Sequence, residues 1–194
     1  MQKRVFIIHG WGGYPNEGWF PWLKKELENR GFDVIIPQMP NSKEPRINQW
    51  IPFLKDTVKE ADEYTYFVGH SIGCQAIARY LENLPKYKKI GGVVFVAGFF
   101  NSLSDFIEED EIVHDIVDEW LKTPLNLNIV KTHFDKSVAI FSDNDPDVPI
   151  INQKDFKDIL KSKIIIEHNK GHFSEDSGVI ELPSALNSIL EMEK

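Results

Sequence analysis

Residues 65–83 have the sequence TYFVGHSIGCQAIARYLEN, which specifies a strand, a tight turn and a helix in direct succession. Residues 65–68 form the kind of β-branched and aromatic run that is typical of a buried strand. Residues 71–83 follow with helical character and stop before Pro85. Because only Gly69 and His70 separate the two elements, Ser71 is expected to lie in the turn between them.

Short apolar runs and longer helical segments alternate along the rest of the chain. Further strands are expected at residues 5–8, 33–36, 92–97, 138–141 and 164–167, and further helices at 19–29, 47–61, 149–160 and 183–192. Nearly continuous apolar strands indicate a sheet that is covered on both faces. The alternation therefore predicts a mostly parallel sheet with helices on both faces, in which ligands bind beyond the carboxyl ends of the strands.

The composition sets limits on the class of protein. The chain has 194 residues and a net charge of -8, and this length predicts a single domain that spans 1–194. The acidic balance argues against nucleic acid or an anionic membrane surface as partner, because phosphate binding needs a clustered basic face. The apolar run at 5–8 is too short for a signal peptide or a membrane span. Cys74 is the only cysteine, so no intramolecular disulfide is expected. This cysteine usage favours a cytoplasmic location.

One segment, residues 101–136, is too long for a simple connection between strands. Within it, residues 105–121 carry apolar side chains on one stripe and acidic side chains elsewhere, which predicts an amphipathic helix followed by a loop that contains Pro124. Two interpretations are open: a cap inserted over the strand ends, or an ordinary packing helix with a solvated acidic face. The same helix at 105–121 could also dock a protein partner.

Ser71 is the candidate nucleophile. In a Gly-x-Ser-x-Gly turn between a strand and a helix, the backbone of the serine is strained and its hydroxyl is exposed, while Gly69 and Gly73 let neighbouring backbone approach. The helix that begins there directs its N-terminus at the reacting oxygen, where negative charge develops. The alternative is that Ser71 is a plain N-cap residue of that helix.

The loop after the first strand, which contains Gly10, Trp11 and Gly12, is the candidate for the rest of an oxyanion hole. We expect the backbone N–H groups of Trp11 and Ile72 to be its two donors. A dinucleotide-binding phosphate loop is the weaker interpretation, because Pro15 stands where its third glycine would fall and no acidic residue ends the second strand.

The acidic partner should follow the next-to-last strand, where Asp143, Asp145 and Asp147 alternate. Asp145 is preferred because it lies at the tip of the loop, from which its side chain can turn back toward the sheet. Asp147 is the better candidate for capping the following helix. A calcium loop is not expected, since Lys154 stands where the bidentate glutamate of such a loop belongs.

His172 follows the last expected strand and is the candidate base. Held by Asp145 through one ring nitrogen, it would remove the proton of Ser71 with the other. His168 lies four residues before it, but a metal pair at that spacing needs a helix, which the intervening asparagine and glycine disfavour. No metal site is therefore expected.

The remaining candidates surround these groups. His70 is expected to shape the turn, and Cys74 to pack beneath it as a small hydrophobic residue. Core packing explains the aromatic residues of the first loop as well as substrate binding does. Substrate contacts are expected from His9, Trp11, Tyr14, Phe99 and Phe100.

Four motifs together resemble the small serine hydrolases of the α/β-hydrolase type that include retinoblastoma-binding protein nine and the YdeN-like hydrolases. The resemblance extends over nearly the whole chain and is weakest at the acidic residues near 105–119. It implies a compact three-layer α/β-hydrolase fold with a six-stranded parallel sheet, and it carries the nucleophile, acid and base onto Ser71, Asp145 and His172. The motifs are His9-Gly10-Trp11, Gly69-His70-Ser71-Ile72-Gly73, Asp145-Pro146-Asp147-Val148-Pro149 and Gly171-His172-Phe173.

These residues predict a serine hydrolase that cleaves a small carboxylic ester, or less readily an amide or peptide, through an acyl-enzyme. The chemistry requires no metal or organic cofactor. Two alternatives remain: a hydrolase fold that binds a protein partner without turnover, and an acyltransferase that passes the acyl group to an acceptor other than water.

Overall fold

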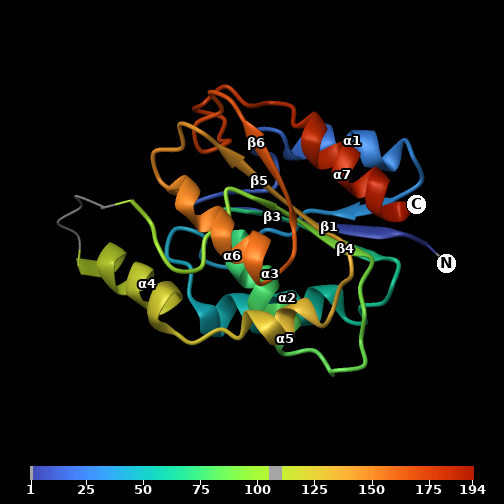
Figure 1. Cartoon of the computed structure of the whole chain (residues 1–194), viewed down its shortest axis with the longest axis horizontal. Helices are drawn as coiled ribbons and strands as arrows, with labels where there is room; N and C mark the ends of the chain where they lie inside the picture. Colours follow the sequence, from blue (N-terminus) through green and yellow to red (C-terminus); the bar gives the residue numbers. More distant parts are fainter. Residues whose placement is uncertain (1, 105–110) are drawn as a thin grey trace.

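The computed structural model describes residues 2–104 and 111–194, which form a six-stranded, wholly parallel sheet in the order β2-β1-β3-β4-β5-β6 (Figure 1). Each expected strand is present, with its ends displaced by no more than two residues. The six-stranded parallel sheet that the resemblance implies for an α/β-hydrolase fold is thereby confirmed. The strands are β1 (Arg4–Ile8), β2 (Asp33–Ile35), β3 (Thr65–His70), β4 (Gly92–Val96), β5 (Ser137–Ser142) and β6 (Lys163–Glu167).

Helices cover both faces of this sheet. On one face, α1 (Phe20–Glu28) packs against α7 (Pro183–Glu193). On the other lie α2 (Ile47–Val58), α3 (Ile72–Glu82), α5 (Leu127–Lys131) and α6 (Gln153–Asp158), as Figure 1 shows. Alternate residues of a strand point to opposite faces of the sheet. In β1, Phe6 and Ile8 contribute to one hydrophobic cluster, and Val5 and Ile7 contribute to the other. This division explains why the strands are almost continuously apolar.

The segment after β4 departs in part from the sequence prediction. Its amphipathic helix is α4 (Glu111–Lys122), while residues 105–110 of the expected helix lie outside the described part of the chain. A second short helix, α5, stands where a loop was expected. The Asn126 side chain caps it by accepting hydrogen bonds from the backbone N–H groups of Asn128 and Ile129 at 3.1 and 3.3 Å.

The expected helix at 149–160 is also modified, because a 3-10 turn, Ile150–Asn152, precedes α6. Its first turn has no side-chain cap, so the prediction that Asp147 caps this helix is wrong. The Asp145 carboxylate instead accepts hydrogen bonds from the backbone N–H groups of Asp147 and Val148 at 2.9 and 3.0 Å. The Asp145 side chain therefore organises the whole turn.

The carboxyl ends of all six strands lie at one edge of the sheet because the strands are parallel. After β1 the chain enters α1 on one face, and after the adjacent β3 it enters α3 on the other. Such a switch point leaves a crevice above the strand ends, where ligands of this fold class bind. None of the described helices is long and apolar enough to span a membrane.

Candidate active site

Ser71 lies at the end of β3 in a backbone conformation that residues other than glycine rarely adopt, with φ 53° and ψ -125°. Its N–H donates to the carbonyl of Val96 at 2.9 Å, which ties the turn to β4. The Ser71 side chain makes no capping hydrogen bond to α3, so the alternative of a simple N-cap residue does not describe it. Strain of this kind persists only where the surrounding structure imposes it.

Close packing on both sides of the turn explains its two glycines. A Cβ atom on Gly73 would lie 2.4 Å from the carbonyl oxygen of Ile8, and one on Gly69 would lie 2.9 Å from the backbone nitrogen of Cys74. The start of α3 thus presses on the end of β1, and the turn presses on α3. Both positions require the absence of a side chain, as the sequence predicts.

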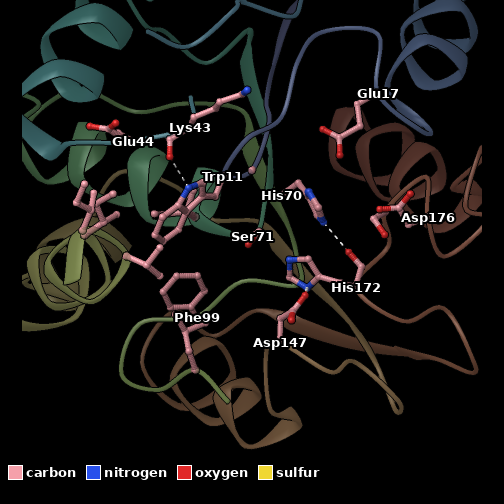
Figure 2. Close-up of a pocket in the computed structure, with 17 residues that line it drawn as sticks. Trp11, Glu17, Lys43, Glu44, His70, Ser71, Phe99, Asp147, His172 and Asp176 are labelled. Carbon is pink, nitrogen blue, oxygen red and sulfur yellow. Dashed lines mark hydrogen bonds and ion pairs between the residues drawn. The ribbon is translucent and has the colours of Figure 1, made fainter. Parts of the chain in front are cut away.

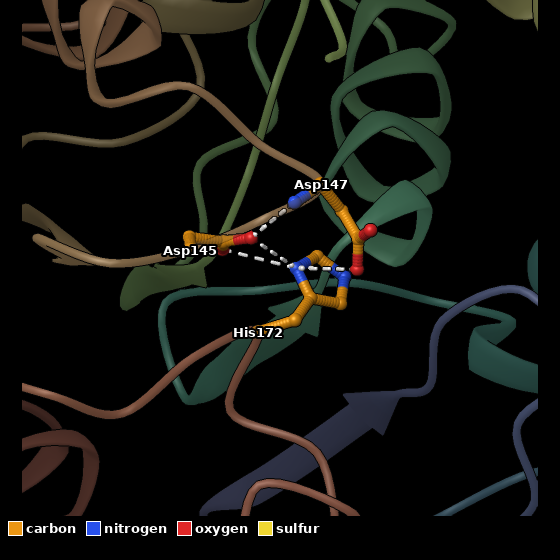
Figure 3. A group of neighbouring side chains, drawn as sticks. All are labelled: Asp145, Asp147 and His172. Atoms are coloured by element: carbon orange, nitrogen blue, oxygen red, sulfur yellow. Dashed lines mark hydrogen bonds and ion pairs between the residues drawn. The ribbon is translucent and has the colours of Figure 1, made fainter. Parts of the chain in front are cut away.

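His172 and Asp145 are joined at the neighbouring strand ends. The Nδ1 atom of His172 lies 3.1 and 3.0 Å from the two carboxylate oxygens of Asp145 (Figure 3). Only 3% of the Asp145 side chain is exposed, against 15% for His172. Since a carboxylate only accepts, Nδ1 carries a proton, and in the uncharged imidazole Nε2 keeps its lone pair.

The other two aspartates of this loop are placed differently. Asp143 turns to the exposed His168, with 2.5 Å between Oδ2 and Nδ1, and this hydrogen bond lowers the pKa of the Asp143 carboxyl. Asp147 reaches His172 only at 3.8 Å, and 45% of its side chain is exposed. Asp145 is therefore the carboxylate that is hydrogen-bonded to His172.

Asp145, Asp147 and His172 also offer three potential metal-ligand atoms within 4.8 Å of one another. An ion there would have to displace the proton on Nδ1 of His172. It would also compete with the two backbone N–H groups that donate hydrogen bonds to Oδ1 of Asp145. The residues fit a hydrogen-bonded pair better than a metal centre. His168 and His172 are each held by a different aspartate, so they do not converge on a common ion.

Ser71 and His172 line the same cavity, whose volume is about 580 Å³ (Figure 2). Trp11 and Ile72 border it as well. Ile72 is the first residue of α3, where backbone N–H groups have no acceptor within the helix. The Trp11 ring is fixed by a 2.8 Å hydrogen bond from Nε1 to the carbonyl of Lys43. A hydroxyl, an imidazole and a helix N-terminus thus meet in one cavity.

His70, the residue before Ser71, connects the turn to the loop that carries His172. Its Nε2 lies 2.7 Å from the carbonyl oxygen of His172, so Nε2 must be the protonated ring nitrogen. The ring packs edge-on against Trp19 and Phe20. Burial, reinforced by the neighbouring His172, lowers the pKa of His70 to about 3, so this imidazole is uncharged at neutral pH.

The expected substrate contacts divide into two groups. Trp11 and Phe99 line the cavity, whereas His9, Tyr14 and Phe100 lie outside its lining. His9 is fully buried, and its Nε2 accepts a hydrogen bond from the Met39 N–H at 3.0 Å. This bond joins the end of β1 to the segment that contains Met39. Phe100 stacks on a core phenylalanine, and the Tyr14 hydroxyl donates to Glu175 at 3.1 Å. Cys74 is fully buried, as expected, and burial raises the pKa of its thiol.

Several cavity residues were not identified from the sequence. Ser174 and Asp176 follow His172 at intervals of two and four, and this proximity was a usable signal. No local pattern distinguished the others, because folding brings them from separate loops and from α4. The additional residues are Glu17, Lys43, Glu44, Leu103, Ile112, Val113, Ile116, Ser174 and Asp176.

Comparison with known proteins places this geometry in a family. The family model described as serine hydrolase matches residues 5–191. The hydrolase YdeN of Bacillus subtilis strain 168 is 36% identical over 94% of this chain and 92% of its own length. The serine hydrolase RBBP9 of Rattus norvegicus is 28% identical over 88% of this chain and 87% of its own. The crystal structure of the ydeN gene product from B. subtilis superposes with a TM-score of 0.89 over 98% of both chains, at 32% identity.

Proposed function

This chain belongs to the serine hydrolase family, and from that premise we propose that it hydrolyses a small carboxylic ester through an acyl-enzyme formed on Ser71. His172 is the general base and acid, and Asp145 holds the imidazole in the productive tautomer. The observation that carries the proposal is the hydrogen bond between His172 and Asp145, together with the cavity that His172 lines with the strained Ser71.

The proposed reaction assigns one role to each of these groups. His172 Nε2 takes the hydroxyl proton of Ser71 as the oxygen attacks the ester carbonyl. The backbone N–H groups of Trp11 and Ile72 stabilise the negative oxygen of the tetrahedral intermediate. His172 then gives its proton to the departing alcohol oxygen, and an acyl-enzyme remains. Water, deprotonated by the same imidazole, releases the acid and restores the serine.

A fluorophosphonate probe tests the nucleophile directly. We expect the wild type to be labelled covalently and the Ser71→Ala variant to remain unlabelled. Hydrolysis of p-nitrophenyl acetate should fall by several orders of magnitude in the same variant, leaving residual catalysis from binding and the oxyanion hole. A Ser102→Ala variant provides the control, because Ser102 lies outside the cavity lining. Labelling of Ser71→Ala at the wild-type rate would overturn the proposal.

Hydrolysis and acyl transfer share the acyl-enzyme, so product analysis with added alcohols or amines distinguishes them. An ester is proposed as the substrate in preference to an amide, because alcohols depart more readily than amines. We also propose a cytoplasmic location, for which the single buried, reduced Cys74 is the support. Protein binding through α4 without turnover would explain neither the strained serine nor the pairing of His172 with Asp145.

A further inference from the structure

The cavity beside Ser71 has two chemically different walls (Figure 2). One is apolar and is made by Trp11, Phe99, Leu103 and three residues of α4, namely Ile112, Val113 and Ile116. The other contains His172 together with the carboxylates of Glu17, Asp147 and Asp176. Lys43 and Glu44 border the cavity with opposite charges that offset each other. A ligand that spans the cavity therefore meets apolar surface at one end and negative charge at the other.

Two of the loops that form the acidic wall, those that carry Glu17 and Asp176, are bonded to each other. The Trp19 Nε1 atom donates to the carbonyl of Phe173 at 3.0 Å, and the Tyr14 hydroxyl donates to the carboxylate of Glu175 at 3.1 Å. These bonds hold the loop that carries Glu17 against the loop that carries His172. The Oε2 atom of Glu17 is buried without a hydrogen-bond partner among the described residues, and burial raises the pKa of its carboxyl. This wall can accept hydrogen bonds from a ligand and repels anions.

The apolar wall depends on α4, which is attached to the segment that contains Pro45 and Arg46. Arg46 forms ion pairs with Asp115 and Glu119 at 2.8 and 3.0 Å. The buried Trp120 donates from Nε1 to the carbonyl of Pro45 at 2.9 Å. These contacts fix the helix so that Val113 and Ile116 face the cavity. The apolar wall is therefore a defined surface.

The chemistry of the proposed reaction orients the substrate between the two walls. His172 must deliver a proton to the departing oxygen, so the leaving group lies on the His172 side and the acyl group on the opposite side. We infer that the substrate joins an apolar acyl group, bound against α4, to an uncharged polar or cationic alcohol, bound beside Glu17 and Asp176. This inference rests on the proposed function.

A series of p-nitrophenyl esters with lengthening acyl chains tests the apolar wall. In the wild type, kcat/KM should rise about threefold to fourfold for each methylene buried, until the wall is filled. Val113→Trp should remove the preference for longer chains, while the acetate ester is still cleaved. Asp118→Trp is the matched control, because it adds the same indole to α4 outside the cavity lining. An unchanged chain-length profile in Val113→Trp would overturn the assignment of this wall.

Butyrate esters of choline, ethylene glycol and glycolate test the acidic wall, since they differ in the charge of the leaving group. We expect the glycolate ester to have a kcat/KM about tenfold below that of the choline ester at low salt, with the difference shrinking as salt is added. The double variant Glu17→Gln, Asp176→Asn should narrow the gap. Equal rates for the three esters would overturn the inference, whereas absence of both turnover and Ser71 labelling would overturn the proposed function itself.

Discussion

Ser71 can hold its strained conformation because the residues around it leave the turn no alternative. Its N–H is bonded to Val96, and Gly69 and Gly73 allow β1 and α3 to press on it from either side. The Gly-x-Ser-x-Gly pattern is informative for this reason, since each glycine corresponds to an identified close contact.

Replacing Gly73 with alanine tests this steric requirement. The new methyl group would lie 2.4 Å from the Ile8 carbonyl oxygen, so either β1 or α3 must move. We expect urea unfolding to show a loss of about 2 kcal/mol or more, with hydrolysis impaired further through displacement of Ser71. Gly31→Ala is the control: its φ is also positive, at +84°, but nothing lies within 4 Å of the added atom. It should cost about 1 kcal/mol and leave activity intact.

The choice among three aspartates is also tested at single residues. Asp145→Asn should lower kcat by about 10⁴-fold, because an amide favours the wrong imidazole tautomer. Asp147→Asn, whose carboxylate lies 3.8 Å from His172, should lower kcat less than tenfold. Asp143→Asn should affect only the exposed contacts with His168 and with the backbone N–H of Asn169. A larger loss of kcat at Asp147 than at Asp145 would reverse the assignment of the acid.

Among the elements, α4 shows where prediction from sequence succeeds and where it stops. The 3.6-residue period of residues 105–121 predicted an amphipathic helix, and α4 is one. The period does not reveal which structure receives the apolar stripe. Arg79 of α3 contributes to the placement of α4, as a buried cation whose guanidinium donates to the carbonyls of Trp120, Thr123 and Pro124 at 3.0, 2.9 and 3.2 Å. No local signal marks such a contact across 41 or more residues.

Removing this guanidinium should loosen the attachment of α4. In Arg79→Leu the three carbonyl groups lose their donors, and we expect urea unfolding to show a decrease of about 3 kcal/mol. The rise of kcat/KM with the length of the acyl chain should become smaller at the same time. Lys122→Gln changes an exposed i,i+4 ion pair on the same helix and should cost under about 0.5 kcal/mol. If Arg79→Leu is no less stable than Lys122→Gln, the buried cation does not anchor α4.

For the molecule as a whole, the alternation of strands and helices predicted the location of the site but not the hydrogen bonds between its loops. Hydrophobic patterning gave six strands, and their parallel arrangement brought Ser71, Asp145 and His172 to one edge. Strand patterning does not specify loop-to-loop hydrogen bonds. The bond from His70 to the His172 carbonyl, between residues 102 apart, belongs to this unpredicted class.

The burial of His70 makes the stability of the whole molecule depend on pH. The native pKa of His70 is about 3, below the ordinary 6.5 of an unfolded chain, and burial also lowers the pKa of His9. Below pH 6.5 the unfolded chain therefore binds protons that the native state does not. Its free energy of unfolding should fall as pH falls from 7 to 5, by up to about 1.4 kcal/mol per pH unit for each such histidine.

His70→Gln isolates the contribution of this one group, because glutamine keeps an N–H donor near the position of Nε2 and cannot titrate. Urea unfolding at pH 7, 6 and 5 should show a shallower decline in the variant than in the wild type, whatever their difference at pH 7. The slope is the decisive quantity because a packing loss changes the free energy of unfolding by the same amount at every pH. Removing a titrating group changes how that free energy varies with pH. Parallel slopes would mean that His70 is protonated in the native state, which its hydrogen bond to a carbonyl permits only if Nδ1 also gains an acceptor or water.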